Sequence, residues 1–180
     1  MKTVFAALFA VSAVAATSCS GVRSEEVKTA AGVDIIRYMG VWHEIARLPN
    51  SFENADLRNA KAAYVLETDG TVRVVNSGVD ADGKRRYAEG RAYAPDKSDF
   101  SKLRVSFFWP FYGDYYILEL APDYSWALVG GRDKRYLWIL ARSASLPETT
   151  LSEILQLAKK RGYDTSKLVY PRRNVGVEQN

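Results

Sequence analysis

Eight short runs of strand-forming residues, separated by turn signals, constrain the fold of this 180-residue chain more than any other feature. Apolar and polar residues alternate along the runs with a period of two, which is typical of strands with one buried face. The dipeptides Asp69-Gly70 and Asp82-Gly83 favour tight turns between successive runs. The runs are residues 41–48, 62–67, 71–77, 86–94, 103–107, 115–120, 126–131 and 136–142.

Eight sequential strands with short connections predict an all-β fold, an eight-stranded antiparallel up-and-down β-barrel. One helix is predicted after the last strand, over residues 146–161, with Ser145 and Glu148 as a capping box. Its apolar stripe would pack against the outside of the barrel. The stripe is Leu151, Ile154, Leu155 and Ala158.

The barrel interior is the candidate ligand site, since eight strands enclose just enough space for one small ligand. Alternation places Trp42, Glu44 and Ala46 inside and Arg47 outside. Several inward positions carry Ala or Gly, which leaves apolar space for a ligand; the alternative is a small barrel filled by side chains. The residues predicted to line the ligand site are Tyr64, Val74, Ala92, Val105, Phe107, Tyr115, Tyr136 and Trp138.

The first residues are typical of a targeting segment. A short positive start and an apolar run lead to small residues before Cys19, the only cysteine of the chain. We therefore expect a signal peptide over residues 1–18, a flexible tether over 19–33 that is lipidated at Cys19, and one domain over 34–180. The alternative is an ordinary secretory signal cleaved nearby.

At three places the chain resembles the lipocalin family, in its bacterial outer-membrane lipoprotein form within the apolipoprotein D-like branch. Gly40-x-Trp42 followed by Glu-Ile-Ala-Arg resembles the first family signature, Pro122-Asp123-Tyr124 the second, and Leu140-Ala141-Arg142 the third. The resemblance covers residues 34–170 and implies that Arg142 lies across Trp42 and closes one end of the barrel. Gly40, Trp42 and Arg142 would then be structural signature residues. Arg142 is also the partner expected for the inward carboxylate of Glu44.

An aromatic connection, Phe108 to Gly113, is expected at the barrel end opposite Trp42, together with Arg132 and Lys134. Exposed aromatic residues are costly unless something covers them, so this connection would either meet lipid or ligand at the open end or fold inward to cap the barrel.

Catalytic and metal-binding patterns are missing from the sequence. The single histidine, His43, is predicted to face outward, and we expect no catalytic residue, no metal site and no cofactor. With a net charge of +4 and no nucleic-acid-binding motif, nucleic acid is not an expected partner.

The resemblance and the predicted cavity together imply a lipid-binding lipoprotein that binds and carries or stores a fatty acid or lysophospholipid, without being an enzyme. It would be anchored to the outer membrane by its N-terminal lipid and face the periplasm. Two alternatives stay open: a carrier of another apolar molecule such as a pigment or haem, or an enzyme that acts on a lipid in the same cup. The sequence also leaves a homodimer open.

Overall fold

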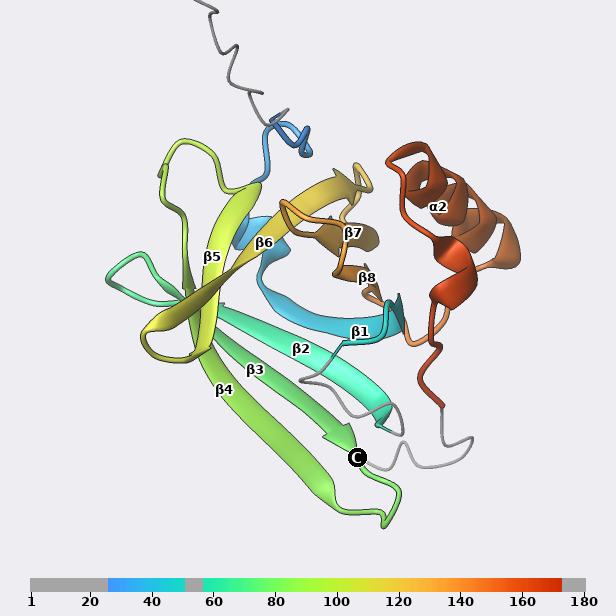
Figure 1. The fold of residues 1–180 in the computed structure, drawn as a ribbon. Helices are drawn as coiled ribbons and strands as arrows, with labels where there is room; N and C mark the ends of the chain where they lie inside the picture. The colour runs from blue at the N-terminus through green and yellow to red at the C-terminus, as the bar shows by residue number, and fades with distance from the viewer. Residues whose placement is uncertain (1–25, 51–56, 173–180) are drawn as a thin grey trace, which may run out of the picture.

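The computed structural model describes residues 26–50 and 57–172, which form a closed barrel of eight antiparallel strands joined in chain order (Figure 1). The predicted fold class, an up-and-down β-barrel with one C-terminal helix, is confirmed. The strands are β1 Gly40–Arg47, β2 Arg58–Leu66, β3 Val72–Val79, β4 Arg85–Tyr93, β5 Lys102–Phe108, β6 Phe111–Leu120, β7 Trp126–Gly130 and β8 Leu137–Ala141. The helices are α1 Ile35–Tyr38, α2 Glu148–Lys160 and the 3-10 turn η1 Thr165–Lys167.

Two strands begin earlier than the sequence predicts. β2 starts at Arg58, which pairs with Val79 beyond a register shift where Asn59 adopts a φ of 50°. β6 starts at Phe111, because Phe111 pairs with Phe108 and closes a tight hairpin. The aromatic connection is therefore the tip of a β-hairpin rather than an irregular loop.

A cluster of buried apolar residues, called the interior cluster, packs the barrel near α1. Further along the interior, Val105, Phe107, Tyr115 and Trp138 pack against this cluster but are only half-buried. The cluster includes Tyr38, Trp42, Ala62, Tyr64, Val72, Val74, Ala92, Leu103, Ile117, Ala127, Val129 and Leu140.

A second apolar cluster, called the outer cluster, joins the outer face of the barrel to α2. Ile154 and Ala158 are fully buried in it, and Leu151 and Leu155 pack against it, so the predicted stripe is confirmed. Figure 1 shows α2 on the side of the barrel formed by β7, β8 and β1. In the part of the chain that the structure describes, no helix has the length and apolarity to cross a membrane.

The predicted capping box of α2 is wrong. The helix begins at Glu148 with Pro147 at the N-cap position, and no side chain of the described residues caps it. Ser145 lies two residues ahead of that cap, and its carbonyl oxygen accepts a hydrogen bond from the hydroxyl of Ser143 instead.

A bulge in β1 changes which side chains point inward. Glu44 pairs with the interior residue Leu140, but Ala46 pairs with Ile139 of the outer cluster, so the register shifts between them. The prediction that Ala46 faces inward and Arg47 outward is therefore wrong. Ala46 packs in the outer cluster, and Arg47 lies opposite Trp138 and faces the interior.

The segment before the barrel makes specific contacts from residue 26 onward. Ala30 donates a backbone hydrogen bond of 2.9 Å to Ile117, and the Glu26 carboxylate pairs with Lys102 at 2.6 Å. Arg161 reaches the carbonyl oxygen of Lys28 at 2.6 Å. The second half of the expected tether is thus docked on the barrel. The expected signal peptide and Cys19 lie outside the described residues.

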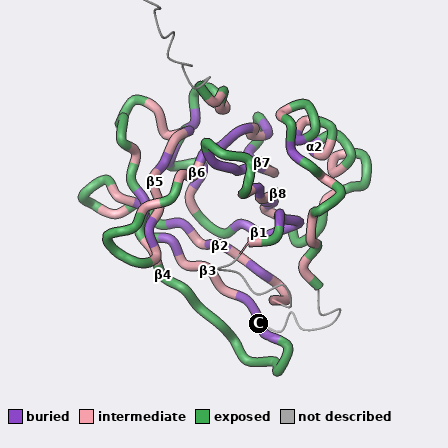
Figure 2. Tube along the Cα trace, in the orientation of Figure 1, coloured by how far each residue is buried: buried purple, intermediate pink, exposed green. Residues whose placement is uncertain are grey.

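β4 is the least covered strand of the barrel. It pairs with β3 along nearly its whole length, from Arg85 opposite Val79 to Ala92 opposite Val72. With β5 it pairs only over residues 91–93. Figure 2 shows β4 exposed along most of its length, where it runs away from β5 and β6.

Candidate functional site

One end of the barrel is closed by an arginine stacked on a tryptophan. The Arg142 guanidinium lies 3.9 Å from the centroid of the Trp42 ring, and it donates hydrogen bonds of 2.7–3.2 Å to three carbonyl oxygens. Gly40 allows this approach: its φ is 96°, and a Cβ there would lie 3.3 Å from Arg142 Nη1. The expected contact between Arg142 and Trp42 is confirmed. The three carbonyl groups belong to Arg37, Tyr38 and Val41.

A chain of three tyrosine hydroxyls lies in the interior above this closed end. The hydroxyl of Tyr115 is 2.7 Å from that of Tyr38 and 2.9 Å from that of Tyr64. Burial, together with the neighbouring tyrosines, raises the pKa of Tyr38 and of Tyr115 well above the ordinary value. The hydroxyls of Tyr38 and Tyr115 therefore stay protonated and act as neutral hydrogen-bonding groups on the interior wall.

The interior also holds an ion pair. Arg47 Nε lies 3.1 Å from Glu44 Oε1, with only 4% and 8% of the two side chains exposed. The expected partner of Glu44, Arg142, is wrong: the bulge in β1 turns Arg47 inward, so that it reaches Glu44 from the same strand. Two charges that neutralise each other in this way leave the interior without a net charge at that point.

The predicted lining residues lie on the interior wall. Tyr64, Val74 and Ala92 are buried in the interior cluster, and Val105, Phe107, Tyr115 and Trp138 are half-buried against it. Tyr136 stacks on Trp138, with ring centroids 6.1 Å apart and an interplanar angle of 17°. The Arg135 guanidinium lies over the Tyr136 ring, 5.5 Å from its centroid.

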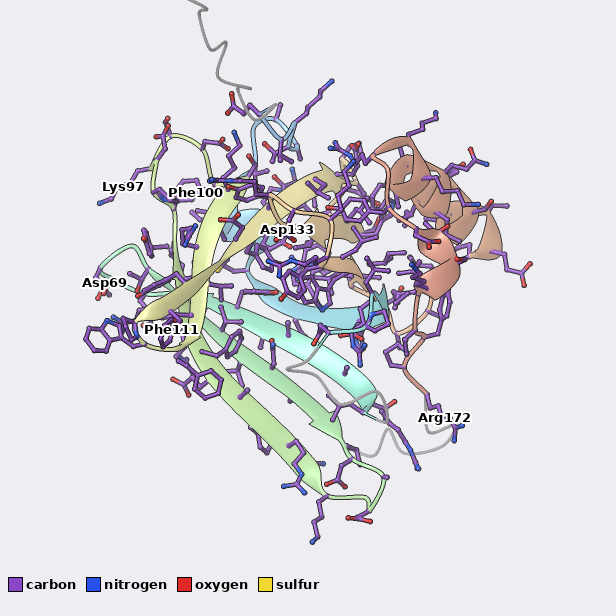
Figure 3. All side chains as sticks on the ribbon, in the orientation of Figure 1. Asp69, Lys97, Phe100, Phe111, Asp133 and Arg172 are labelled. Carbon is purple, nitrogen blue, oxygen red and sulfur yellow. The ribbon has the colours of Figure 1, made fainter. Side chains whose placement is uncertain are left out.

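The end of the barrel opposite Trp42 is called the mouth here; it is formed by the connections that follow β1, β3, β5 and β7. Large aromatic side chains stand exposed on its β5–β6 hairpin: Phe108 by 78%, Trp109 by 83% and Phe111 by 78%. Figure 3 shows Phe111 at the outer tip of that hairpin. The hairpin therefore does not fold inward to cap the barrel, so that alternative is wrong; contact of the hairpin with lipid or ligand stays a prediction.

The cations expected at the mouth point elsewhere. Arg132 contacts Asp114 at 3.8 Å and the Tyr116 hydroxyl at 3.4 Å, on the outer face of β6. Lys134 lies over Gly162, with its Nζ 2.5 Å from the place of a Cβ on that glycine. Neither cation is turned toward the interior, and Arg135 takes the position over Tyr136 instead.

Sequence reasoning misses two features of this interior. The period-two rule cannot find the inward Arg47, because a bulge changes the phase of β1 at a point that no residue type marks. Tyr38 stands ahead of the first strand, where only its position before Gly40 and Trp42 hints that it closes the barrel.

Metal-binding geometry is not found in residues 26–50 and 57–172, where no three His, Cys, Asp or Glu side chains gather closely enough to hold an ion. His43 pairs with Lys61 on one side and Ala141 on the other, as a half-buried residue of the β1 ladder.

Comparison with known proteins places these features in a family. A model of the lipocalin-like domain matches residues 33–173. The chain is 41% identical over 152 residues to temperature-induced lipocalin-1 of Arabidopsis thaliana, covering 80% of this chain and 81% of that protein. It is 39% identical over 148 residues to outer membrane lipoprotein Blc of Vibrio cholerae serotype O1, covering 81% and 86%. Insecticyanin from the tobacco hornworm Manduca sexta has a similar structure, with a TM-score of 0.67, 27% identity, and coverage of 86% and 88%.

Proposed function

Because this chain belongs to the lipocalin family, we propose that it binds a fatty acid or a lysophospholipid inside its barrel and carries or stores it without chemistry. The observation that carries the proposal is the burial gradient along the interior. Side chains next to Trp42 are fully buried, whereas Phe107, Tyr115 and Trp138 pack against the same cluster and keep exposed surface. A ligand tail would fill that surface.

The interior wall suits an acyl chain. Val105, Phe107 and Trp138 offer apolar surface, and each methylene removed from water contributes about 0.8 kcal/mol. The closed end limits how deep the tail can go, since Arg142 and Trp42 seal it.

The polar head of the ligand belongs near the mouth. There the Tyr136 ring stacks on Trp138 and carries the Arg135 guanidinium on its side, so a carboxylate or phosphate would meet a hydroxyl and a cation. Arg135 also pairs with Asp133 at 2.6 Å, on a side chain that is 74% exposed. An exposed pair of this kind is worth little in water and can be exchanged for a ligand anion.

The β5–β6 hairpin would bring the mouth to a membrane. Phe108, Trp109 and Phe111 have no cover in the part of the chain that the structure describes, and three large exposed aromatics on one hairpin tip suit the interface of a bilayer. A lipid could then pass between the bilayer and the barrel without crossing water.

The proposed location is the outer membrane, facing the periplasm. Relatives from Vibrio cholerae and Escherichia coli are named outer membrane lipoprotein Blc. Cys19 follows an apolar start in the manner of an acylated cysteine. Mass spectrometry of the N-terminal peptide tests this directly, since acylation adds a mass that an unmodified Cys19 lacks.

Ligand binding is tested by native mass spectrometry and by tryptophan fluorescence titration with palmitate and with a lysophospholipid. We expect a retained lipid, and a fluorescence change that disappears in Trp138→Phe but persists in Trp126→Phe, because Trp126 packs in the outer cluster. A preparation that retains no lipid and shows no fluorescence change with either lipid would contradict the proposal.

The two alternatives give different results in the same experiment. A coloured preparation whose absorbing molecule is released on extraction would identify a pigment or haem carrier. A bound lipid that is recovered with an altered mass after incubation would indicate an enzyme, and replacing Tyr136 or Glu44 would then abolish that conversion.

A further inference from the structure

One half of β4 presents an open strand edge. From Arg85 to Gly90 the strand pairs with β3, but its other side has no strand neighbour among residues 26–50 and 57–172. Figure 1 shows this half of β4 as the outermost ribbon, with the β5–β6 hairpin turned away from it. A row of backbone N–H and C=O groups without ladder partners is a template for another strand.

The edge opens at a fork where β5 leaves β4. β5 lies close over Gly90: a Cβ there would lie 2.6 Å from the carbonyl oxygen of Ser106 and 2.8 Å from the Phe107 ring. Beyond this contact a groove of about 500 Å³ lies between β4 and the hairpin. The Ser106 hydroxyl lines it, buried and without a hydrogen-bond partner among the described residues. The groove is also lined by Arg73, Glu89, Gly90, Arg91, Phe107, Trp109 and Tyr112.

The outward-facing side chains of the open edge have complementary charges. Arg85 and Glu89 flank Tyr87 two residues to either side, and all three share one face of the strand. Tyr87 is 65% exposed. Neither Arg85 nor Glu89 forms an ion pair with any described residue.

We propose that the open edge of β4 pairs with the same edge of a second copy of this chain, antiparallel about a two-fold axis at Tyr87. This axis is perpendicular to the sheet, so the outer faces of the two β4 strands lie on the same side. Two residues that lie opposite each other must therefore point to the same face. With the axis at Tyr87, Arg85 of each copy lies opposite Glu89 of the other. Two cross-strand ion pairs then flank the two Tyr87 rings.

Charge selects this register over its neighbours. An axis at Ala88 would set Arg85 of each copy opposite Arg91 of the other. Two pairs of like charges would then face each other across the interface. An axis at Arg86 would set Arg85 opposite Tyr87 and leave Glu89 near the β3–β4 turn, without an arginine across from it. The Tyr87 axis is the one that pairs both free charges.

The same register brings the β3–β4 turn of one copy to the groove of the other. Lys84 of one copy lies opposite Gly90, so the exposed Asp82, two residues before Lys84, approaches the groove that contains Arg91 and Arg73. The groove therefore receives an acidic turn, and the second copy covers the unpaired Ser106 hydroxyl.

A disulfide tests the axis directly. In the full chain with Cys19→Ser no other cysteine remains, so Tyr87→Cys introduces a single thiol. Opposite residues of an antiparallel pair have Cα atoms about 4.5–5.5 Å apart, which a disulfide spans. We expect mild oxidation to convert this variant to a covalent dimer. Glu89→Cys, the matched control, places its two thiols four residues out of register and should not cross-link.

Charge reversal tests the register in the uncross-linked protein. Arg85→Glu and Glu89→Arg should each raise the dimer dissociation constant about tenfold in analytical ultracentrifugation, because each puts like charges opposite one another twice. The double variant should restore the dimer. A chain that is monomeric at all concentrations, or a Tyr87→Cys variant that cross-links no faster than Glu89→Cys, would overturn the proposal.

Discussion

Arg47 Nε lies 3.1 Å from Glu44 Oε1 inside the barrel, although the two residues stand three apart on one strand, where regular alternation would put them on opposite faces. The register shift between Glu44 and Ala46 makes the pairing possible. One bulge therefore supplies the counter-ion of a buried carboxylate from its own strand, and it also turns Ala46 out against the cluster that carries α2.

Arg47→Met should be strongly destabilising. It leaves the Glu44 charge buried without its ion-pair partner, which costs about 3–5 kcal/mol of unfolding free energy. The double variant Glu44→Gln with Arg47→Met should recover much of that loss. Urea unfolding followed by circular dichroism measures both.

The matched control for this prediction is Arg73→Met. Arg73 pairs with Glu67 at 2.9 Å, but about two fifths of each side chain is exposed, so the loss should stay below about 1 kcal/mol. Equal losses for Arg47→Met and Arg73→Met would show that the interior pair has no special role.

Tyr115→Phe should cost more than either Tyr38→Phe or Tyr64→Phe. Tyr115 bonds both neighbours, so its removal leaves two enclosed hydroxyls without that partner, at about 1–3 kcal/mol for each group that finds no other. Removing an end of the chain breaks one of these bonds only. The unfolding free energies of the three phenylalanine variants check the order.

Stability should fall as pH rises above about 10. Tyr38 and Tyr115 have pKa values raised by burial, so the native state keeps protons that the unfolded chain loses in that range. Because the unfolded state then binds fewer protons, its formation becomes easier with rising pH. Tyr38→Phe should flatten this fall. In absorbance titration at alkaline pH, a native protein in which all eleven tyrosines ionise together near pH 10 would contradict this.

The sequence predicts the topology well because alternation and turn residues are local signals. The contact of Arg142 with Trp42 follows from the family resemblance, and Asp69-Gly70 and Asp82-Gly83 mark turns in the structure as expected. The inward Arg47 is not predictable in this way, because a bulge is a tertiary adjustment between β1 and β8. The outward direction of Arg132 has the same origin, since it depends on Asp114 and Tyr116 of a neighbouring strand.

Gly90→Ala should destabilise the fork between β4 and β5. The new Cβ would lie 2.6 Å from a backbone oxygen and 2.8 Å from the Phe107 ring, so the two strands must move apart, at about 1–3 kcal/mol. Gly113→Ala is the control on β6, since the nearest atom to its Cβ would be 4.0 Å away. Thermal unfolding of both variants tests the difference, and a control that loses as much stability would refute the steric explanation.

Replacing Trp109 and Phe111 together by Ser should slow lipid exchange with membranes and leave ligand affinity unchanged. Both rings stand exposed on the hairpin tip, away from the interior wall, so the barrel keeps its binding surface. Each ring that enters a bilayer interface contributes up to about 1.5–3 kcal/mol, so the double variant should bind vesicles at least tenfold more weakly. Transfer of a fluorescent fatty acid from vesicles measures the rate, and titration in solution measures the affinity.

The control for membrane contact is Ile36→Ser, which removes an apolar side chain that is 73% exposed on α1, at the closed end of the barrel. If contact runs through the mouth, this variant should exchange lipid at the rate of the unmodified protein. Equal slowing by Ile36→Ser and by the hairpin variant would mean that general surface apolarity, and not the mouth, brings the protein to the bilayer. Loss of affinity in solution would instead place the two hairpin rings within the ligand site.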